Sequence, residues 1–192
     1  MDNSFYSDEE LNKLGFKTIG KNCLISRFAR FYSIEKIEIG NYVRIDDFCI
    51  LSGSIQLGSY IHISAYCALY GNNGITIGDF SGLSPKSIIF SASDDFSGNY
   101  LINPMVPLKY RNVIEGEVKI GKYVQLGANT IVMPNCSIGE GAVTGSMALV
   151  NSNLDNWQIY VGIPVKVLKK REKKLLRFVK DLNDLNEHDG NK

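Results

Sequence analysis

The sequence has few of the residues that build metal or redox sites. It contains two histidines, His62 and His188, and four cysteines, none of them in a CxxC motif or another metal-ligand spacing. Structural zinc sites and disulfide frameworks depend on such spacings. The sequence therefore predicts neither a bound metal nor a disulfide framework.

It also lacks a charge excess and a long apolar run. Lysine and arginine number 21 against 20 aspartates and glutamates, so the net charge of +1 gives no reason to expect nucleic acid as a partner. No apolar run approaches the roughly 20 residues of a membrane span, and the start, MDNSFYSDEEL, is too acidic for a secretory signal. We expect a cytoplasmic protein with one domain and no membrane insertion.

What the sequence does contain is a repeat of six residues. An aliphatic side chain recurs at every sixth position within each stretch of the repeat. The series is interrupted between stretches, and Thr144 is its one polar member. A weaker start, at Ile19, Ile25 and Phe31, precedes the main series. The main positions are Ile39, Ile45, Leu51, Leu57, Ile63, Leu69, Ile77, Leu83, Ile89, Ile120, Leu126, Val132, Ile138, Thr144 and Val150.

A second register lies four positions after each aliphatic residue. Most of its members are small or β-branched, and it includes all four cysteines, Cys23, Cys49, Cys67 and Cys136. Free cysteine is often a small buried residue. We therefore interpret the cysteines as core residues rather than as catalytic or metal-binding ones.

An aliphatic-glycine pair recurs about once in every eighteen residues, as in Ile39-Gly40 and Leu57-Gly58. Three six-residue steps, each a short strand and a turn, make one triangular coil, and successive coils stack at about 4.8 Å as parallel strands. A period of six does not hold one face of a helix of 3.6 residues per turn. The spacing therefore predicts an all-β solenoid.

The pattern [LIV]-[GAED]-x-x-[STAVC]-x over Ile19 to Val150 resembles the hexapeptide-repeat acyltransferases. The resemblance implies a left-handed parallel β-helix of about six to seven triangular coils over residues 19–168. It also implies a homotrimer whose active sites lie between subunits, with acetyl-CoA as the acyl donor. A zinc-dependent carbonic anhydrase of the same architecture needs three histidine ligands, so that activity is excluded.

The two ends are expected to be helical. Ser7 and Glu10 have capping-box spacing, which predicts a short helix that covers the first coil within residues 1–18. In the terminal segment 169–192, KKREKKLLRFVKDLNDL is predicted to be a helix after Pro164. Its apolar stripe is predicted to pack on its own subunit or on a neighbouring one, and consists of Leu175, Val179, Leu182 and Leu185.

The repeat is interrupted by a long loop, 94–117, and the chain is predicted to leave the third face of the prism after Ile89 and to rejoin the coils at Val118. Its aromatic and aliphatic residues and two X-Pro pairs favour an ordered arm over disorder. The run SDDFSG…NPMVP resembles a branch of surface-polysaccharide acetyltransferases. In the family such an arm reaches the adjacent subunit and helps form the acceptor pocket, so Asn103 and Tyr110 are candidate substrate-binding residues.

The arm lacks the histidine that many members of the family carry there. His62 is the alternative base, because it lies outward between two inward residues, in a column with Arg44, Gly82 and Gln125; Arg44 is a further candidate for substrate binding. An ordinary surface histidine is the competing interpretation. Asp94 and Asp95 are candidates for an alternative base, a partner of His62, an acceptor-binding group or a turn-forming pair.

The resemblance also implies where coenzyme A binds. Gly127, Ala128 and Ser146 match positions beside the pantetheine arm, although coil packing would also require small residues there. The closing segment YVGIPVKVLKK resembles the family motif G-x-P-x-[RK]. It implies that the phosphates contact Lys166, Lys169 or Lys170, and the competing interpretation is a solvated basic face.

The predicted function is acetyl transfer from acetyl-CoA to an amine or hydroxyl of a sugar, expected to be nucleotide-linked and used in surface-polysaccharide synthesis. A sugar hydroxyl needs a base more than an amine does, so the missing loop histidine favours nitrogen slightly. The acceptor sugar and the acyl chain length stay open. The alternative is a non-catalytic scaffold or glycan-binding β-helix.

Overall fold

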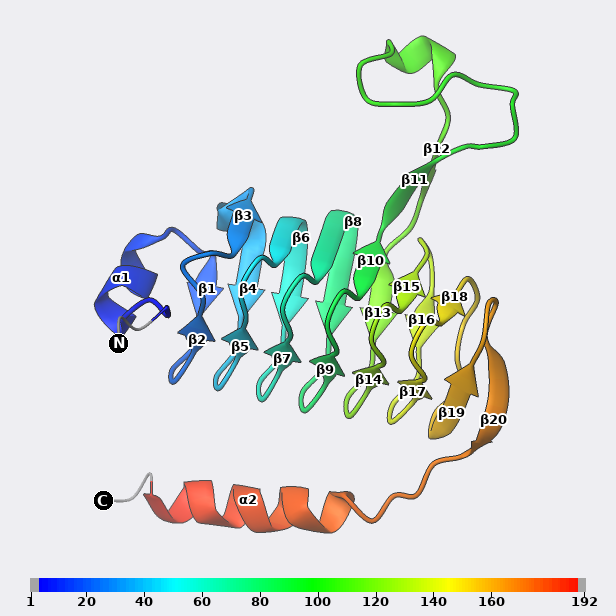
Figure 1. Ribbon diagram of the computed structural model, residues 1–192. Helices are drawn as coiled ribbons and strands as arrows, with labels where there is room; N and C mark the ends of the chain where they lie inside the picture. Colours follow the sequence, from blue (N-terminus) through cyan, green and yellow to red (C-terminus); the bar gives the residue numbers. More distant parts are fainter. Residues whose placement is uncertain (1–3, 190–192) are drawn as a thin grey trace.

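The computed structural model describes the backbone of residues 4–189 and the side chains of residues 4–182. The chain winds into about seven stacked coils, and an arm rises from one edge of the stack (Figure 1). Nearly all strand pairs are parallel, the arm ribbon and the last pair excepted. The predicted all-β solenoid is confirmed.

The coils present three faces. The first face contains β1 (Thr18–Ile19), β4 (Ile37–Ile39), the ends of β6 (Ile50–Leu57) and β8 (Ala68–Ile77), β13 (Val118–Ile120) and β16 (Ser137–Ile138). The second contains β2 (Leu24–Ile25), β5 (Arg44–Ile45), β7 (His62–Ile63), β9 (Gly82–Leu83), β14 (Gln125–Leu126), β17 (Val143–Thr144) and β19 (Gln158–Val161). The third contains β3 (Arg30–Tyr32), the starts of β6 and β8, β10 (Ile88–Phe90), β15 (Ile131–Val132) and β18 (Leu149–Val150).

The interior is built from the two predicted registers. Ile45, Leu51, Ile63 and Leu69 are fully buried, and the other members of the six-residue series between Ile39 and Val150 are at most 3 % exposed. All four cysteines are buried and unpaired. The interpretation of the cysteines as core residues is therefore confirmed, and burial raises the pKa of Cys23 and of Cys136.

The outward side chains differ sharply between the faces. On the first face, the column in register is Glu38, Gln56, Thr76, Lys119 and Ser137. On the third face, the corresponding column begins with Arg30 and continues with the apolar residues Ile50, Ala68, Ile88, Ile131 and Leu149. The first face thus carries polar side chains that suit solvent, whereas the third presents an apolar stripe to the outside.

The N-terminal end is covered by α1 (Asp8–Lys13). Its capping box has the predicted form, because the Ser7 side chain accepts from the backbone of Glu10 while the Glu10 carboxylate accepts from the backbone of Ser7. Arg27 holds the same carboxylate through two hydrogen bonds of 2.6 and 2.7 Å. This clamp ties α1 to the turn after β2.

The C-terminal segment departs from its prediction. Residues Lys166–Lys170 form strand β20, which pairs antiparallel with β19, and the helix α2 begins only at Leu176 and ends at Asp189. The predicted helix is therefore wrong for residues 169–175. The open edge of β19 offers backbone partners that an isolated, lysine-rich first turn would lack.

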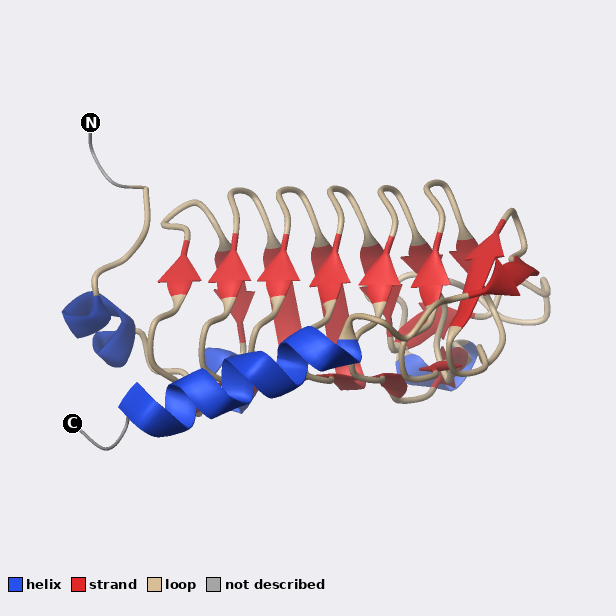
Figure 2. Cartoon of the chain, turned by 90° about the horizontal axis from the view of Figure 1, so that it is seen from below, coloured by secondary structure: helices blue, strands red, loops and turns tan. Residues whose placement is uncertain are grey.

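Helix α2 lies along the corner between the first and second faces (Figure 2). Its side chains Val179 and Leu182, with Leu175 just before the helix, line an apolar hollow with Phe80 and Tyr123, so the apolar stripe faces its own subunit. Leu185 lies outside the described side chains. Within residues 4–189, no helix is long and apolar enough to cross a membrane.

The corner under α2 is an aromatic ladder. Four consecutive ring pairs have centroids 4.7 to 6.0 Å apart. The rings come from turns with a left-handed backbone, namely Tyr42, Tyr60, Phe80, Tyr123 and Trp157, and the turn between the last two has Gly141, which leaves room for the Trp157 ring. Because every coil repeats the same turn, rings at this corner stack at the spacing of the strands.

The arm leaves the third face after β10 and returns at β13, as predicted. It starts as an antiparallel ribbon of β11 (Ala92–Asp94) and β12 (Val113–Glu115), carries a single 3-10 turn at Leu108–Tyr110, and projects away from the coils (Figure 1). Much of its apolar surface is exposed, with Met105 at 90 % and Leu108 at 79 %. In one subunit, nothing covers these side chains.

Candidate functional site

His62 lies on the second face in the predicted column. Strand pairing places Arg44, His62, Gly82 and Gln125 side by side on successive coils. Gly82 leaves no open space beside the imidazole, because a Cβ on Gly82 would lie 2.5 Å from Gln125 Oε1. The Gln125 amide donates instead to Ser84 Oγ at 3.0 Å.

His62 is held by a carboxylate that is not among the candidates predicted from the sequence. His62 Nε2 lies 2.8 Å from Asp46 Oδ2, and Arg44 Nε donates to Asp46 Oδ1 at 2.7 Å. The Asp46 side chain is 19 % exposed. Burial raises the pKa of Asp46, but the hydrogen bonds from Arg44 and His62 outweigh it, so the net pKa lies below its ordinary value.

The position of Asp46 beside His62 could have been predicted from the sequence. It occupies the first turn position after the second-face strand, in the same place as Ser64, Ser84 and Gly127 in later coils. Column counting that included the turns, not only the strands, would have placed it beside His62. Arg44 is consequently engaged with Asp46, and its guanidinium also lies over the Phe5 ring at 5.4 Å.

The two adjacent aspartates of the arm point to different partners. Asp95 accepts from the backbone of Ser97 at 2.7 Å and from Asn112 Nδ2 at 2.8 Å. These hydrogen bonds, that from Asn112 most strongly, hold the pKa of Asp95 below its ordinary value. Asp94 accepts from the backbone of Asn103 at 3.0 Å. Asp95 therefore caps the turn of its own loop, as one of the predicted alternatives required.

Neither arm aspartate contacts His62 within this subunit. Their hydrogen bonds stay inside the arm, while His62 is held by Asp46 from the preceding coil. Within one subunit, Asp94 and Asp95 therefore do not meet His62, and a role for either of them as its partner stays a prediction about a site shared between subunits. The physical reason is that the arm projects away from the coils instead of folding back over the second face (Figure 1).

A hollow of about 380 Å³ lies where the arm joins the coils. Arg111 lines it, is only 13 % exposed, and donates through Nη2 to Asp94 Oδ1 at a long 3.4 Å. Its Nε is buried and has no hydrogen-bond acceptor among the described residues. An unpaired buried donor costs about 1–3 kcal/mol, so it calls for a physical explanation.

The other arm candidates lie on its surface. Asn103 has a left-handed backbone, and its side-chain oxygen accepts from the backbone of Met105 at 3.0 Å. Tyr110 is half exposed, with Lys109 Nζ 4.7 Å from the centre of its ring. Both residues lie away from His62 in this subunit and keep their substrate-binding roles only as proposals.

The three small candidates for coenzyme A contact form the turns beside the second face. A Cβ on Gly127 would lie 2.5 Å from the backbone of Gly145 in the next coil, so close stacking alone requires glycine there. The Ala128 carbonyl accepts from the backbone of Met147. Ser146 is exposed and open to a ligand.

The three candidate phosphate ligands, Lys166, Lys169 and Lys170, lie on β20 with exposed side chains. None of them forms an ion pair within the described part of the chain, so all three charges are available to an anion. No cluster that would hold a metal is found among the described residues either. His188 lies outside the described side chains.

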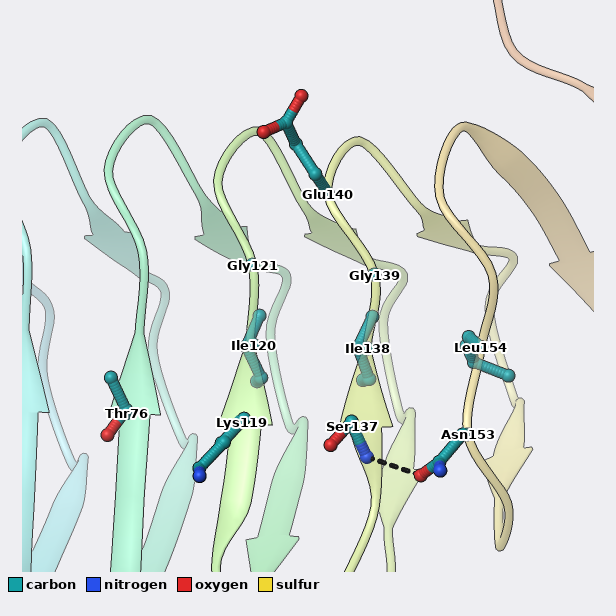
Figure 3. Close-up of a pocket in the computed structure, with 10 residues that line it drawn as sticks. All are labelled: Thr76, Lys119, Ile120, Gly121, Ser137, Ile138, Gly139, Glu140, Asn153 and Leu154. Carbon is teal, nitrogen blue, oxygen red and sulfur yellow. Dashed lines mark hydrogen bonds between the residues drawn. The ribbon is translucent and has the colours of Figure 1, made fainter.

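A second hollow, of about 420 Å³, lies on the first face between the last coils (Figure 3). Asn153 accepts from the backbone of Ser137 at 2.8 Å across it. Lys119 pairs with Glu117 at 3.0 Å rather than with another lining residue. None of the candidate catalytic, substrate-binding or coenzyme A-binding residues lines it, and we interpret it as a dent next to the irregular last coil.

The geometry can be compared with known proteins. The family model described as bacterial transferase hexapeptide (six repeats) matches residues 117–152. A dTDP-4-amino-4,6-dideoxy-D-glucose acyltransferase from Escherichia coli is 43 % identical over 177 residues, which cover 90 % of this chain and 92 % of that protein.

Solved structures give the same result. AntD, an N-acyltransferase from Bacillus cereus, superposes with a TM-score of 0.94 and 49 % identity, covering 96 % of this chain and 99 % of that one. Its crystal structures contain dTDP-4-amino-4,6-dideoxyglucose with coenzyme A, or dTDP with 3-hydroxybutyryl-CoA. In that protein, Ser84 and Asp94 have each been replaced. The fold, the arm and these relatives together show that this chain belongs to the hexapeptide-repeat acyltransferases.

Proposed function

We propose that this enzyme transfers an acyl group from a coenzyme A thioester to the amino group of a dTDP-linked 4-amino-4,6-dideoxyhexose. The observation that carries the proposal is similarity along the whole chain, arm included, to acyltransferases described with that sugar. We place the reaction in the cytoplasm and its product in surface-polysaccharide synthesis.

The reaction needs an oriented amine and a route for one proton. The amine nitrogen attacks the thioester carbonyl carbon, the C–S bond breaks, and coenzyme A leaves as the thiol after it receives the proton that the nitrogen loses. We assign His62 as the group that takes this proton, with Asp46 as the residue that orients it. Because His62 Nε2 faces Asp46, Nδ1 is the nitrogen offered to the substrate.

Asp94 is proposed to bind the acceptor amine. This chain has serine at position 84 and aspartate at 94, the residue types replaced in AntD at those numbers. Ser84 lies beside Gln125 on the second face, whereas Asp94 lies in the arm. We therefore place the two in one site that combines the coils of one subunit with the arm of the next.

A homotrimer would create that site. The apolar stripe of the third face and the exposed apolar side chains of the arm, such as Met105 and Leu108, both need covering. Three copies joined through their third faces would bury the stripe at a closed interface. The arm of each copy would then meet a neighbour.

The acyl donor is proposed to lie along the later coils. Gly127 and Ala128 would let the pantetheine arm approach the backbone, with Ser146 as a hydrogen-bonding side chain. Lys166, Lys169 and Lys170 would meet the phosphates as separate point charges. The chain length of the acyl group is set by the site and is measured in the experiment below.

The test is a thiol-release assay with acetyl-CoA and 3-hydroxybutyryl-CoA against dTDP-4-amino-4,6-dideoxyglucose and its 4-hydroxy counterpart. We expect turnover with the amino sugar and a mass increase that survives mild alkali, since amides survive where esters hydrolyse. Absence of thiol release with every amino sugar, in a preparation that binds coenzyme A, would refute the proposal. Absence of coenzyme A binding by calorimetry would instead support the non-catalytic scaffold.

A further inference from the structure

The hollow at the base of the arm is lined by charged groups that lie close together. Asp94 ends β11 and Arg111 lies two residues before β12, and the two side chains are in contact at the edge of the hollow. The neighbouring Asp95 accepts from the Ser97 backbone at 2.7 Å, whereas the Arg111–Asp94 contact is long, at 3.4 Å, and lies beside an open space. The hollow is lined by Asn72, Ala92, Ser93, Asp94, Leu108, Arg111, Val113 and Glu115.

The side chain of Arg111 is largely buried although it makes few hydrogen bonds. Its guanidinium is largely buried, yet only one hydrogen bond is formed, at 3.4 Å, and Nε has no acceptor among the described residues. Hydrogen bonds of a binding site are often long before the ligand arrives and shorten in the complex. A ligand oxygen that enters the hollow would let the guanidinium turn and pair this donor.

Asp94 is held from a second side. The backbone of Asn103 donates to its Oδ2 at 3.0 Å, while Arg111 lies at Oδ1. The carboxylate is therefore fixed in orientation and still has accepting capacity, because each oxygen has two lone pairs. This leaves a defined position for an additional donor.

The charge of the hollow indicates which ligand group fits. Two carboxylates, Asp94 and Glu115, face one guanidinium, so the lining is negative in sum. A pyrophosphate would be repelled there, whereas an amine beside a hydroxyl complements an acceptor carboxylate next to an N–H donor. The amino end of an amino sugar has this arrangement on neighbouring ring carbons.

We propose that the arm-base hollow holds the amino end of the acceptor, with Asp94 accepting from the amine and Arg111 donating to the hydroxyl oxygen on the adjacent carbon. The inference rests on the proposed function and adds to it a binding residue, Arg111, and a requirement for the acceptor. Arg111 also acts as a positioning residue for Asp94. An acceptor without that hydroxyl should accordingly be a poor substrate.

The test pairs two acceptors with four proteins. The acceptors are dTDP-4-amino-4,6-dideoxyglucose and its 3-deoxy analogue, and the proteins are wild type, Arg111→Lys, Arg111→Gln and the control Lys109→Ala, which removes a nearby exposed cation. We expect the wild type and the control to lose about tenfold or more in kcat/KM on the 3-deoxy acceptor. In Arg111→Gln, the two acceptors should react at similar, low rates, and Arg111→Lys should keep part of the preference.

The outcomes separate the two levels of the proposal. A wild type that turns over no amino sugar refutes the proposed function and this inference with it. A wild type that is active, with the same loss on the 3-deoxy acceptor in Arg111→Gln as in wild type, overturns the inference alone. If Arg111→Gln instead changes the oligomeric state in ultracentrifugation and leaves discrimination intact, the unpaired donor belongs to a subunit contact, which also overturns it.

Discussion

At the scale of single residues, the histidine on the second face is defined by its neighbours. Asp46 accepts from both Arg44 and His62, so one carboxylate fixes a cation and an imidazole on adjacent coils. Such a partner sets the orientation and the tautomer of the ring. His62 thereby differs from an unconstrained surface histidine, although it is half exposed.

Replacement of Asp46 by asparagine should lower kcat more than it raises KM. If His62 is the base, its own replacement by alanine should cost about 10²–10⁴-fold, and loss of its orienting carboxylate should cost part of that factor. The measurement is steady-state kinetics with the thiol-release assay.

The matched control is Asp47→Asn, which changes the adjacent carboxylate, an acceptor from Ser26 Oγ rather than from His62. Equal losses in the two variants would show that the effect is one of folding. Wild-type kinetics in Asp46→Asn would remove His62 from the reaction.

Gly127 gives a prediction about stability. A methyl group there would overlap the Gly145 backbone of the next coil. We expect Gly127→Ala to lower the free energy of unfolding by about 1–3 kcal/mol, measured by denaturant titration. Ser146→Ala, an exposed change one coil later, should be close to neutral. If Gly127→Ala is equally neutral but binds coenzyme A more weakly, ligand approach rather than coil stacking explains the glycine.

At the scale of secondary-structure elements, the N-terminal helix is attached through one carboxylate. Hydrogen bonds from Arg27 first, then from Ser7, lower the pKa of Glu10 from its ordinary value of 4.5 to about 2. A lowered pKa in the folded state adds stability above the unfolded-state pKa, and this contribution disappears as the pH falls through the folded-state pKa. The clamp should therefore loosen between about pH 4.5 and 2.

The comparison of wild type with Glu10→Gln isolates this effect. The difference in their melting temperatures should be constant near pH 7, shrink below about pH 4.5, and approach zero near pH 2. Glu9→Gln, which changes a carboxylate paired only with Lys13 in the same helix, should show a smaller difference throughout. A difference that does not depend on pH would show that the clamp is not what joins α1 to the coils.

The two terminal helices differ in how well the sequence specified them. Ser7 and Glu10 close α1 through contacts three residues apart, so a local motif was sufficient. The segment after Pro164 has helix-forming residues from Lys169 onward, yet as far as Lys170 it forms strand β20, which pairs antiparallel with β19 across a turn of four residues. Pairing with the open edge of β19 overrode the helix propensity of these residues, and that propensity contains no information about a free strand edge.

At the scale of the whole molecule, the three faces of the prism have different roles. The first is polar, the second carries His62 and Gln125, and the third presents Ile50, Ile88 and Ile131. Only the third face resembles an interface core. The predicted trimer is therefore expected to form through it.

A charge on the third face should break the assembly. We expect Ile131→Asp to shift the protein towards monomers in ultracentrifugation and to abolish turnover, because a site shared between subunits would be lost. The control Ser137→Asp adds the same charge on the first face and should leave assembly unchanged. A monomeric variant with full activity would contradict the shared site.

The sequence by itself determined the winding of the chain. Its six-residue period placed Ile45, Leu51 and Cys49 inside, set the column of Arg44, His62 and Gly82, and gave the points where the arm leaves and returns. The contacts between coils can be predicted from the sequence of a repeat protein, because each coil contacts only its neighbours and the residues in contact are found by counting along the chain.

Only the tertiary structure decided the partners of the functional side chains. It paired His62 with Asp46, turned Asp95 onto its own loop, and left the Nε of Arg111 buried without an acceptor beside Asp94. These choices depend on side-chain directions and on an arm with no repeat. Where periodicity ends, contacts no longer follow from sequence spacing, and only the folded arrangement of the arm fixes them.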